Sequence, residues 1–256
     1  MPFPTKIRKT DLSAAAQERF ARLEGRPRFL ADWDDALFLH YAIDPAVLRP
    51  HVPFELDLRD GMAYISLVAF TQRRLRPVLF PAARWLMRPL AEHAFLNVRT
   101  YVWHGDERGI FFLIEWVPSR SACLIGPRLY GLPYRLAALD YRHDRGAEEL
   151  TGVVTTASHL AYCAHVEATA TPQPCEPGSL DEFLLERYIA FTERRRRRRA
   201  FRIWHPPWPQ VRVDGVSIDG GLLTHACPWM RQAELMGGNF SAGVHDVCIG
   251  PPHRVA

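Results

Sequence analysis

IGPRLYGLPYRL, residues 125–136, places two glycines and two prolines among residues that are otherwise aromatic, aliphatic and cationic. Glycine tolerates backbone angles and close approaches that a side chain would forbid, and proline cannot donate a hydrogen bond to a β-ladder. The pattern predicts an irregular crossing between strands. The segment also gathers Arg128, Tyr130, Tyr134 and Arg135, whose guanidinium and hydroxyl groups can recognise an anion. A tight turn with solvated arginines is the simpler interpretation of the spacing alone.

Length and composition indicate a globular chain made of many short elements. The 256 residues are 48% hydrophobic and include 21 prolines and 16 glycines, so one large β or α/β domain or two small ones would fit. The net charge is +4, and the run from Arg194 to Arg199 alone contributes six positive charges, which leaves +4 − 6 = −2 for the rest. A globally basic surface for nucleic acid is therefore not indicated, and we regard a nucleic-acid partner as an unfavoured alternative.

Lysine is almost absent from this chain, and its absence limits the chemistry. Lys6 and Lys9 are the only lysines, and all other basic side chains except histidine are arginine. Arginine stays protonated and is a poor nucleophile. A reaction that needs a lysine amine in the core of the domain is therefore not expected.

The cysteines and the apolar runs predict a protein with reduced thiols that does not enter a membrane. Five cysteines are scattered without a CxxC pair, which argues against a zinc site and against a disulfide framework. No apolar run reaches the ~18–20 residues that span a bilayer. The first residues lack the apolar core of a secretory signal. We expect a soluble cytoplasmic protein with no metal and no cofactor.

Alternating apolar residues predict a mainly β (α+β) domain with a few peripheral helices. An N-terminal extension, residues 1–28, is expected to carry a short helix at 11–24, and residues 29–256 are expected to form a single domain. Further helices are expected at 44–50, 119–124, 179–194 and 221–235. Strands are expected at 28–43, 62–73, 94–104, 110–117, 136–144, 150–157, 161–170, 200–204, 210–218 and 243–249.

The hairpin predicted at 94–117 carries bulky residues on both faces. Phe95, Asn97, Arg99, Tyr101 and Trp103 alternate on one face of its first strand. On the second strand, strict alternation groups Phe111, Leu113, Glu115 and Val117. Strands with two bulky faces are typical of a closed or two-layered β structure.

Five short segments follow one another along nearly the whole chain: YISLVAF at 64–70, NVRTYV at 97–102, RLYGLPY at 128–134, HPPWP at 205–209 and GVHDV at 243–247. Together they resemble the YqjF-like family of uncharacterised bacterial proteins (domain of unknown function 2071). The resemblance implies the fold of acetoacetate decarboxylase, a cone-shaped antiparallel β-barrel with an interior pocket. In those decarboxylases two adjacent lysines follow the proline of the crossing, and the first forms a Schiff base. Here Tyr134 and Arg135 follow Pro133, so Schiff-base decarboxylation is not expected.

The face that holds Asn97, Arg99 and Tyr101, beside Glu115, is the first candidate site. These groups could bind a carboxylate or carbonyl ligand inside the barrel, or form an ion pair that serves structure only. His205, before the rigid Pro206-Pro207-Trp208-Pro209 turn, could act as a base or ligand, although a structural histidine is the commoner case.

The run from Arg194 to Arg199 follows the helix expected at 179–194. The run fits a solvated helix end and turn, with contact to nucleic acid or an anionic membrane as the alternative.

We therefore predict a pocket for a small acidic or carbonyl-containing organic molecule. The expected ligand contacts are Asn97, Arg99, Tyr101, Arg128, Tyr130, Tyr134, Arg135 and His205. Whether a reaction takes place is left open; a lyase or hydrolase-type pocket would use Glu115 as acid or base. The oligomeric state is left open as well, with a homo-oligomer among the alternatives.

The alternative function is a non-catalytic interaction protein whose arginine run contacts an acidic partner. A barrel filled by Phe95, Trp103 and Phe111 would favour this alternative. An open cavity lined by Arg99 and Glu115 would favour the pocket.

Overall fold

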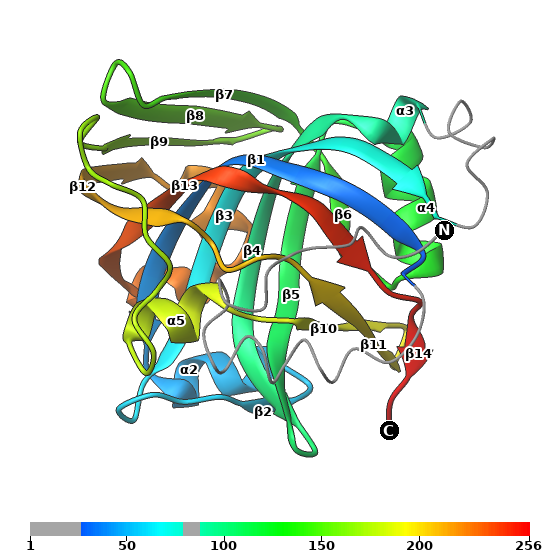
Figure 1. Ribbon diagram of the computed structural model, residues 1–256. Helices are drawn as coiled ribbons and strands as arrows, with labels where there is room; N and C mark the ends of the chain where they lie inside the picture. The colour runs from blue at the N-terminus through cyan, green and yellow to red at the C-terminus, as the bar shows by residue number, and fades with distance from the viewer. Residues whose placement is uncertain (1–26, 79–87) are drawn as a thin grey trace.

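Long strands dominate the computed structural model, which describes residues 27–78 and 88–256 (Figure 1). The helix expected at 11–24 lies outside the described residues, and the division between residues 28 and 29 stays a prediction. The strands are β1 (Phe29–Ile43), β2 (Glu55–Leu56), β3 (Ala63–Pro77), β4 (His93–His104), β5 (Glu107–Val117), β6 (Tyr134–Leu136), β7 (Ala138–Asp144), β8 (Glu149–Thr155), β9 (His159–His165), β10 (Ile189–Arg194), β11 (Arg197–Trp204), β12 (Gln210–Asp219), β13 (Glu234–Ile249) and β14 (His253–Arg254).

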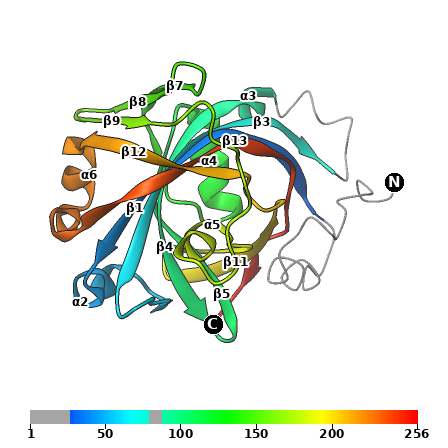
Figure 2. The same cartoon turned by 60° about the vertical axis from the view of Figure 1, so that its left-hand side comes forward.

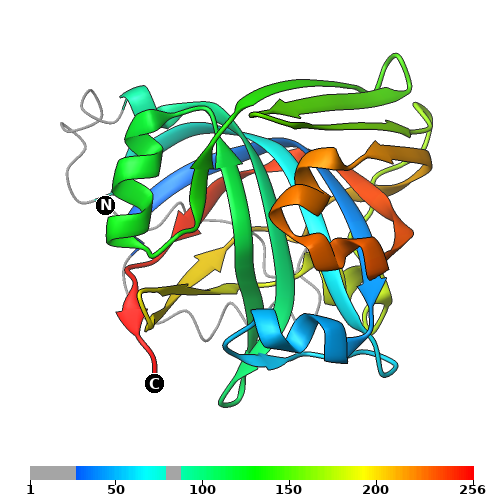
Figure 3. The ribbon, with the colours of Figure 1, turned by 180° about the vertical axis from the view of Figure 1, so that it is seen from behind.

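The helices of the described chain are short and connect or flank the strands. They are α2 (Pro45–Leu48), α3 (Arg88–Ala91), α4 (Arg120–Leu129), α5 (Leu180–Leu185), α6 (Gly221–Ala226) and the 3-10 helices η2 (Arg49–His51) and η4 (Pro228–Gln232). Seen from behind, α4 lies at one side of the sheet, and α6 with η4 lies at the other (Figure 3). The predicted mainly β class with few peripheral helices is confirmed.

All the strands belong to one 14-stranded sheet, and part of this sheet closes on itself. The order β11-β10-β5-β4-β3-β1-β13 becomes a ring because β11 also pairs with β13. From β13 the sheet continues through β12, β9 and β8 to β7, and these last three strands lie over one end of the ring (Figure 2).

The sheet is mixed, and the purely antiparallel arrangement that the resemblance implied is wrong in two places. β6 and β10 both pair with β5 in parallel. A parallel neighbour requires a crossover instead of a hairpin, and α4 supplies the crossover between β5 and β6. The irregular crossing predicted at 125–136 is partly wrong for the same reason, because α4 includes its first residues and Pro127 lies within that helix.

Two hydrophobic cores lie on the two faces of the long strands. On β4, Leu96 and Val98 belong to one core, whereas Phe95 and Tyr101 belong to the other. This alternation confirms the prediction that both faces of the hairpin at 94–117 are buried.

The helix expected at 179–194 is wrong beyond Leu185. Ser179 caps its start as predicted, with its hydroxyl accepting a hydrogen bond of 3.1 Å from the backbone of Glu182. The apolar residues after Leu185 fit a helix and a strand equally well. Ile189 and Phe191 enter one core while Ala190 enters the other, because β10 pairs with both β5 and β11.

The arginine run forms a β-hairpin, so the helix end predicted there is wrong, whereas the predicted turn is present. Arg195 and Arg196 occupy the turn between β10 and β11, with φ angles of 52° and 60°. Arg194 and Arg199 instead donate hydrogen bonds to the carbonyl groups at the end of α4, at Pro127, Arg128 and Leu129. Their positive charge therefore complements the dipole of α4.

Candidate functional site

A cavity of about 220 Å³ lies inside the ring, with α4 forming part of its wall. Strands β1, β3, β4, β5 and β11 contribute most of the other walls, and the lining is mainly aromatic and aliphatic. Its aromatic side chains include Phe38, Phe70, Phe95, Phe112, Phe201 and Trp208. Such a largely apolar hollow with a few polar groups is the usual form of a small-molecule site.

Two polar side chains of β4 project into this cavity. Asn97 and Arg99 are separated by one residue, so the strand alternation puts both on the same face as Phe95. Asn97 is 5% exposed, and its Oδ1 has no hydrogen-bond partner among the described residues. Asn97 is paired across the sheet with Glu115 of β5.

Glu115 reaches the cavity because of a bulge in β5. Val98 pairs with Ile114 and Arg99 pairs with Phe112, so Leu113 is an extra residue with no partner on β4. The bulge puts Phe112 and Glu115 on the cavity side. The predicted grouping of Glu115 with Phe111 and Leu113 is therefore wrong, because strict alternation does not allow for the inserted residue.

Burial controls the chemistry of Glu115. Its side chain is 3% exposed, and Oε2 has no hydrogen-bond partner among the described residues. Burial raises the pKa of this carboxyl group well above its usual range. Glu115 thus favours the protonated, neutral form, which can donate a hydrogen bond or a proton.

Arg99 is a buried cation that is not balanced by a carboxylate. It is 8% exposed, and within the described part of the chain it forms no ion pair with Glu115 or any other acid. One terminal nitrogen donates a 3.1 Å hydrogen bond to the carbonyl of Leu184, but Nε has no partner there. The guanidinium carbon lies 5.5 Å from the ring centre of Phe38. A structural ion pair between Arg99 and Glu115, the alternative left open above, is therefore not formed.

Tyr130, Tyr134 and His205 also line the cavity. The hydroxyl of Tyr130 already donates to the carbonyl of Gly250 at 3.0 Å, and burial raises its pKa to about 12. Burial, and then the neighbouring Glu115, raises the pKa of Tyr134 well above its usual range. Burial and then the charge of Arg99 lower the pKa of His205 to about 4, so the imidazole is neutral near pH 7.

Three predicted contact residues lie outside the cavity. Tyr101 is buried beside it, and its hydroxyl donates to the carbonyl of Leu184 at 2.8 Å. Arg128 donates to the carbonyl of Leu124 at 2.7 Å on the surface of α4. Arg135 is exposed on β6. The strand alternation correctly predicts that Tyr101 shares a face with Asn97 and Arg99, but its hydroxyl is hydrogen-bonded to the carbonyl of Leu184.

Other residues line the cavity that the sequence analysis missed. His93 precedes Phe95 on the same face of β4, so the alternation of that strand could have identified it. Its ring centre lies 4.6 Å from that of Phe95, and burial lowers its pKa to about 4. Trp33 and Arg187 come from β1 and from the turn before β10, and no local motif marks them.

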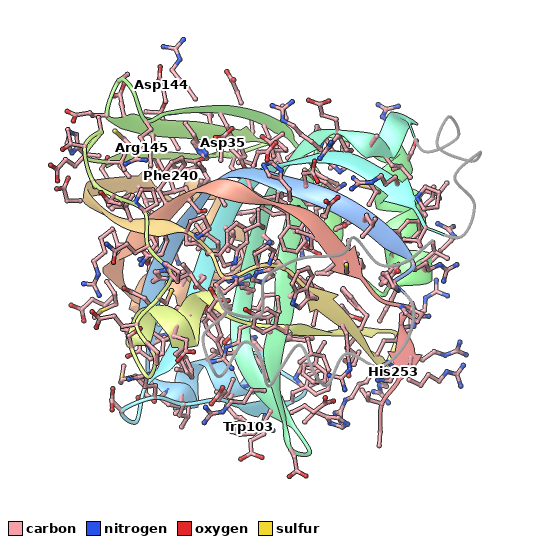
Figure 4. The ribbon with its side chains drawn as sticks, viewed as in Figure 1. Asp35, Trp103, Asp144, Arg145, Phe240 and His253 are labelled. Carbon is pink, nitrogen blue, oxygen red and sulfur yellow. The ribbon has the colours of Figure 1, made fainter. Side chains whose placement is uncertain are left out.

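Whether aromatic side chains fill the interior distinguishes the pocket from the non-catalytic interaction protein. Of the three residues that would fill a closed interior, only Phe95 lines the cavity. Phe111 packs in the other core, and Trp103 lies far along β4, near the hairpin (Figure 4). The open cavity lined by Arg99 and Glu115 is the arrangement that favours the pocket.

Within residues 27–78 and 88–256, no group of three or more His, Cys, Asp or Glu side chains is arranged to hold a metal ion. In the same described ranges, no helix is long and apolar enough to cross a membrane.

The chain belongs to the family of uncharacterized conserved proteins DUF2071, whose model matches residues 30–234. It is 33% identical to the uncharacterized protein YqjF of Bacillus subtilis over 180 residues, which is 69% of this chain and 72% of YqjF. The resemblance found in the sequence is thereby confirmed.

Solved structures with the same fold are acetoacetate decarboxylase-like proteins. An acetoacetate decarboxylase-like enzyme from Sphingomonas wittichii gives a TM-score of 0.61 at 17% identity, covering 90% of this chain and 94% of that one. The acetoacetate decarboxylase of Legionella pneumophila gives a TM-score of 0.61 at 11% identity, covering 100% of this chain and 98% of that one. The enduracididine biosynthesis enzyme MppR, complexed with pyruvate, gives a TM-score of 0.61 at 11% identity, covering 91% of this chain and 92% of that one. At these identities the comparison establishes the fold alone.

Proposed function

We propose that this protein binds a small organic acid or carbonyl-containing acid in the cavity of its strand ring, with Arg99 as the anion contact. One observation carries the proposal: Arg99 is a buried cation that faces the cavity without a carboxylate partner among the described residues. A buried charge is costly unless it is paired. A bound anion would supply the missing partner through charge-assisted hydrogen bonds.

The neighbouring polar groups suit the rest of such a ligand. Glu115 in its neutral form can donate a hydrogen bond to a carbonyl oxygen, and Oδ1 of Asn97 can accept one from a hydroxyl. Because Asn97 and Glu115 are opposite each other on β4 and β5, one ligand can contact both. His205 is neutral and therefore adds no competing charge near pH 7.

The solved structures with the same fold give limited support. One of them, a structure of MppR, contains pyruvate, a small keto acid. Fold alone does not transfer an activity. The proposal therefore rests on Arg99 and uses the neighbours only as support.

We further propose that any reaction proceeds without a Schiff base. An imine requires an amine, and the crossing carries Tyr134 and Arg135 where the decarboxylases carry lysines. If chemistry occurs, Glu115 is the group suited to protonate a carbonyl or enol oxygen, because it holds its proton at a pH where an exposed carboxyl group has lost it. After incubation with pyruvate and cyanoborohydride, the peptides from residues 27–256 should have unchanged masses. A reduced adduct between residues 27 and 256 would contradict this.

The test of binding is a thermal-shift screen of small carboxylates and keto acids on the wild type and two variants. A ligand at 100 times its Kd stabilises the native state by about 2.7 kcal/mol, so Tm rises. Arg99→Met should abolish the shift, because it removes the cation and keeps most of the side-chain volume. Arg128→Met is the matched control, since Arg128 lies on the surface outside the cavity, and it should retain the full shift.

Failure of the whole panel to shift the wild type would contradict the proposal. Equal shifts in the wild type and in Arg99→Met would remove Arg99 as the anion contact. The interaction alternative would then be tested with variants of the arginine hairpin.

A further inference from the structure

The cavity has a wall of touching aromatic rings that the acid-binding proposal does not explain. We propose that the ligand is an aromatic carboxylic acid with a single ring, whose ring stacks on this wall while its carboxylate contacts Arg99. The inference rests on the proposed function and narrows it to one class of acid.

The wall begins at Arg99 and leads away from it. The ring of Phe38 lies 5.5 Å from the guanidinium carbon and 5.1 Å from Trp208, edge to face. Trp208 is stacked on Trp33 at 6.1 Å with 12° between the planes. Each of these residues lines the cavity, so the row of rings connects the cation with the apolar part of the hollow.

The row continues from Trp33 to β4. Trp33 lies 5.5 Å from Phe70, and Phe70 is stacked on Phe95 at 5.1 Å with 5° between the planes. Phe95 in turn contacts His93 at 4.6 Å and Tyr134 at 5.8 Å. Aromatic pairs of this geometry favour an inserted aromatic ring over an aliphatic group, by roughly 2- to 12-fold for each contact.

The spacing along β4 limits the distance between the aromatic ring and the carboxylate of the ligand. Phe95 and Arg99 are four residues apart on one face, which places their Cα atoms about 13 Å apart along an extended strand. Both side chains lean into the same cavity, which shortens the gap between ring and guanidinium. A ring that carries its carboxylate on a short chain fits this gap better than a carboxylate attached directly to the ring.

Size and charge restrict the ligand further. The cavity of about 220 Å³ is smaller than the roughly 300–1,000 Å³ typical of sites for drug-sized molecules, so it admits one ring with a short chain. Arg99 is the cation of the lining that has no acid partner among the described residues, whereas Arg187 is paired with Asp57 at 2.7 Å. A monoanion balances this charge, and a second carboxylate would be buried without a partner.

The test compares two acids that differ only in aromaticity, 3-phenylpropanoate and 3-cyclohexylpropanoate, by isothermal titration calorimetry. Cyclohexyl is the more apolar ring, so simple burial would favour it. The wild type should bind the phenyl acid at least 5-fold more tightly. Phe95→Leu should reduce this ratio to about 1 while still binding the cyclohexyl acid. The control Phe111→Leu changes the same residue type on the opposite face of the hairpin and should keep the ratio.

The outcomes separate this inference from the proposed function. Equal affinity for both acids, or tighter binding of the cyclohexyl acid, overturns the aromatic inference and leaves acid binding intact. Binding of neither acid to the wild type, together with a negative screen of aliphatic keto acids, overturns both. Should Phe95→Leu fail to fold, the ratio in the wild type and the same ratio in Phe70→Leu decide the question.

Discussion

Replacing Glu115 by glutamine should stabilise the protein by an amount that grows with pH. Glutamine has the shape of the protonated carboxyl group but does not titrate. Burial raises the native-state pKa of Glu115 well above 4.5, so the folded protein keeps a proton that the unfolded chain releases above that pH. In this window the unfolded state binds fewer protons than the native state, and the stability of the wild type falls as pH rises.

The magnitude follows from this difference in protonation. One pKa unit corresponds to about 1.4 kcal/mol, so the advantage of Glu115→Gln should be near zero at pH 4.5 and about 1.4 kcal/mol at pH 5.5. The advantage keeps increasing at this slope until the pH reaches the native-state pKa of Glu115. The buried histidines titrate in both proteins, so their contributions cancel in the difference.

Urea denaturation followed by tryptophan fluorescence at half-unit pH steps measures the effect. Exposed Glu234 provides the control, because Glu234→Gln makes the same chemical change at the surface, away from the cavity. A constant difference between Glu115→Gln and the wild type from pH 4.5 to 6.5 would refute the reasoning. It would mean that Glu115 is ionised in the folded state.

Three further predictions concern the groups around the cavity. Asp57→Asn removes an ion-pair partner of buried Arg187, 2.7 Å away. It should lower the unfolding free energy, measured by urea denaturation, by about 3–5 kcal/mol, and a loss below about 1 kcal/mol would contradict this. Gly126→Ala would put a methyl group 2.4 Å from Cε2 of Tyr134. The cost of this overpacking, about 1–3 kcal/mol, should outweigh the gain in helix propensity of about 1 kcal/mol, so Tm should fall. A higher Tm would contradict the packing of α4 against Tyr134. Burial lowers the pKa of His40 to about 3, so between pH 6.5 and 3 the unfolded state binds a proton that the folded state excludes. The unfolding free energy therefore decreases by about 1.4 kcal/mol for each unit by which the pH is lowered in this window. His40→Gln should lose that part of the slope in the same denaturation series, and an unchanged slope would show that His40 is protonated in the fold.

The strands and their faces could be predicted from the sequence because alternation is a local signal. The spacing of Asn97 and Arg99 predicts that they share one face of the strand, and the structure places both in the cavity. The same rule failed for the neighbours of Glu115, because the bulge at Leu113 is set by pairing with β4. A bulge depends on the partner strand, so it leaves little trace in one sequence.

The helix that was wrong beyond Leu185 shows a second limit of the sequence. Ile189 and Phe191 satisfy helical spacing as well as strand alternation, and their tertiary pairing with β5 and β11 decides between the two. The aromatic wall was missed for a related reason. Trp33, Phe70, Phe95 and Trp208 are distant in the sequence, and only closure of the ring brings them together.

The most direct test of the account is a crystal structure of the protein soaked with 3-(4-bromophenyl)propanoate, with data collected at the bromine absorption edge. We predict an anomalous peak in the cavity, against the row of rings formed by Trp33, Phe70 and Phe95, with the carboxylate within hydrogen-bonding distance of Nε of Arg99. A carboxylate bound away from Arg99, or a bromine site outside the cavity, would contradict the assignment of Arg99 as the group that recognises an organic acid.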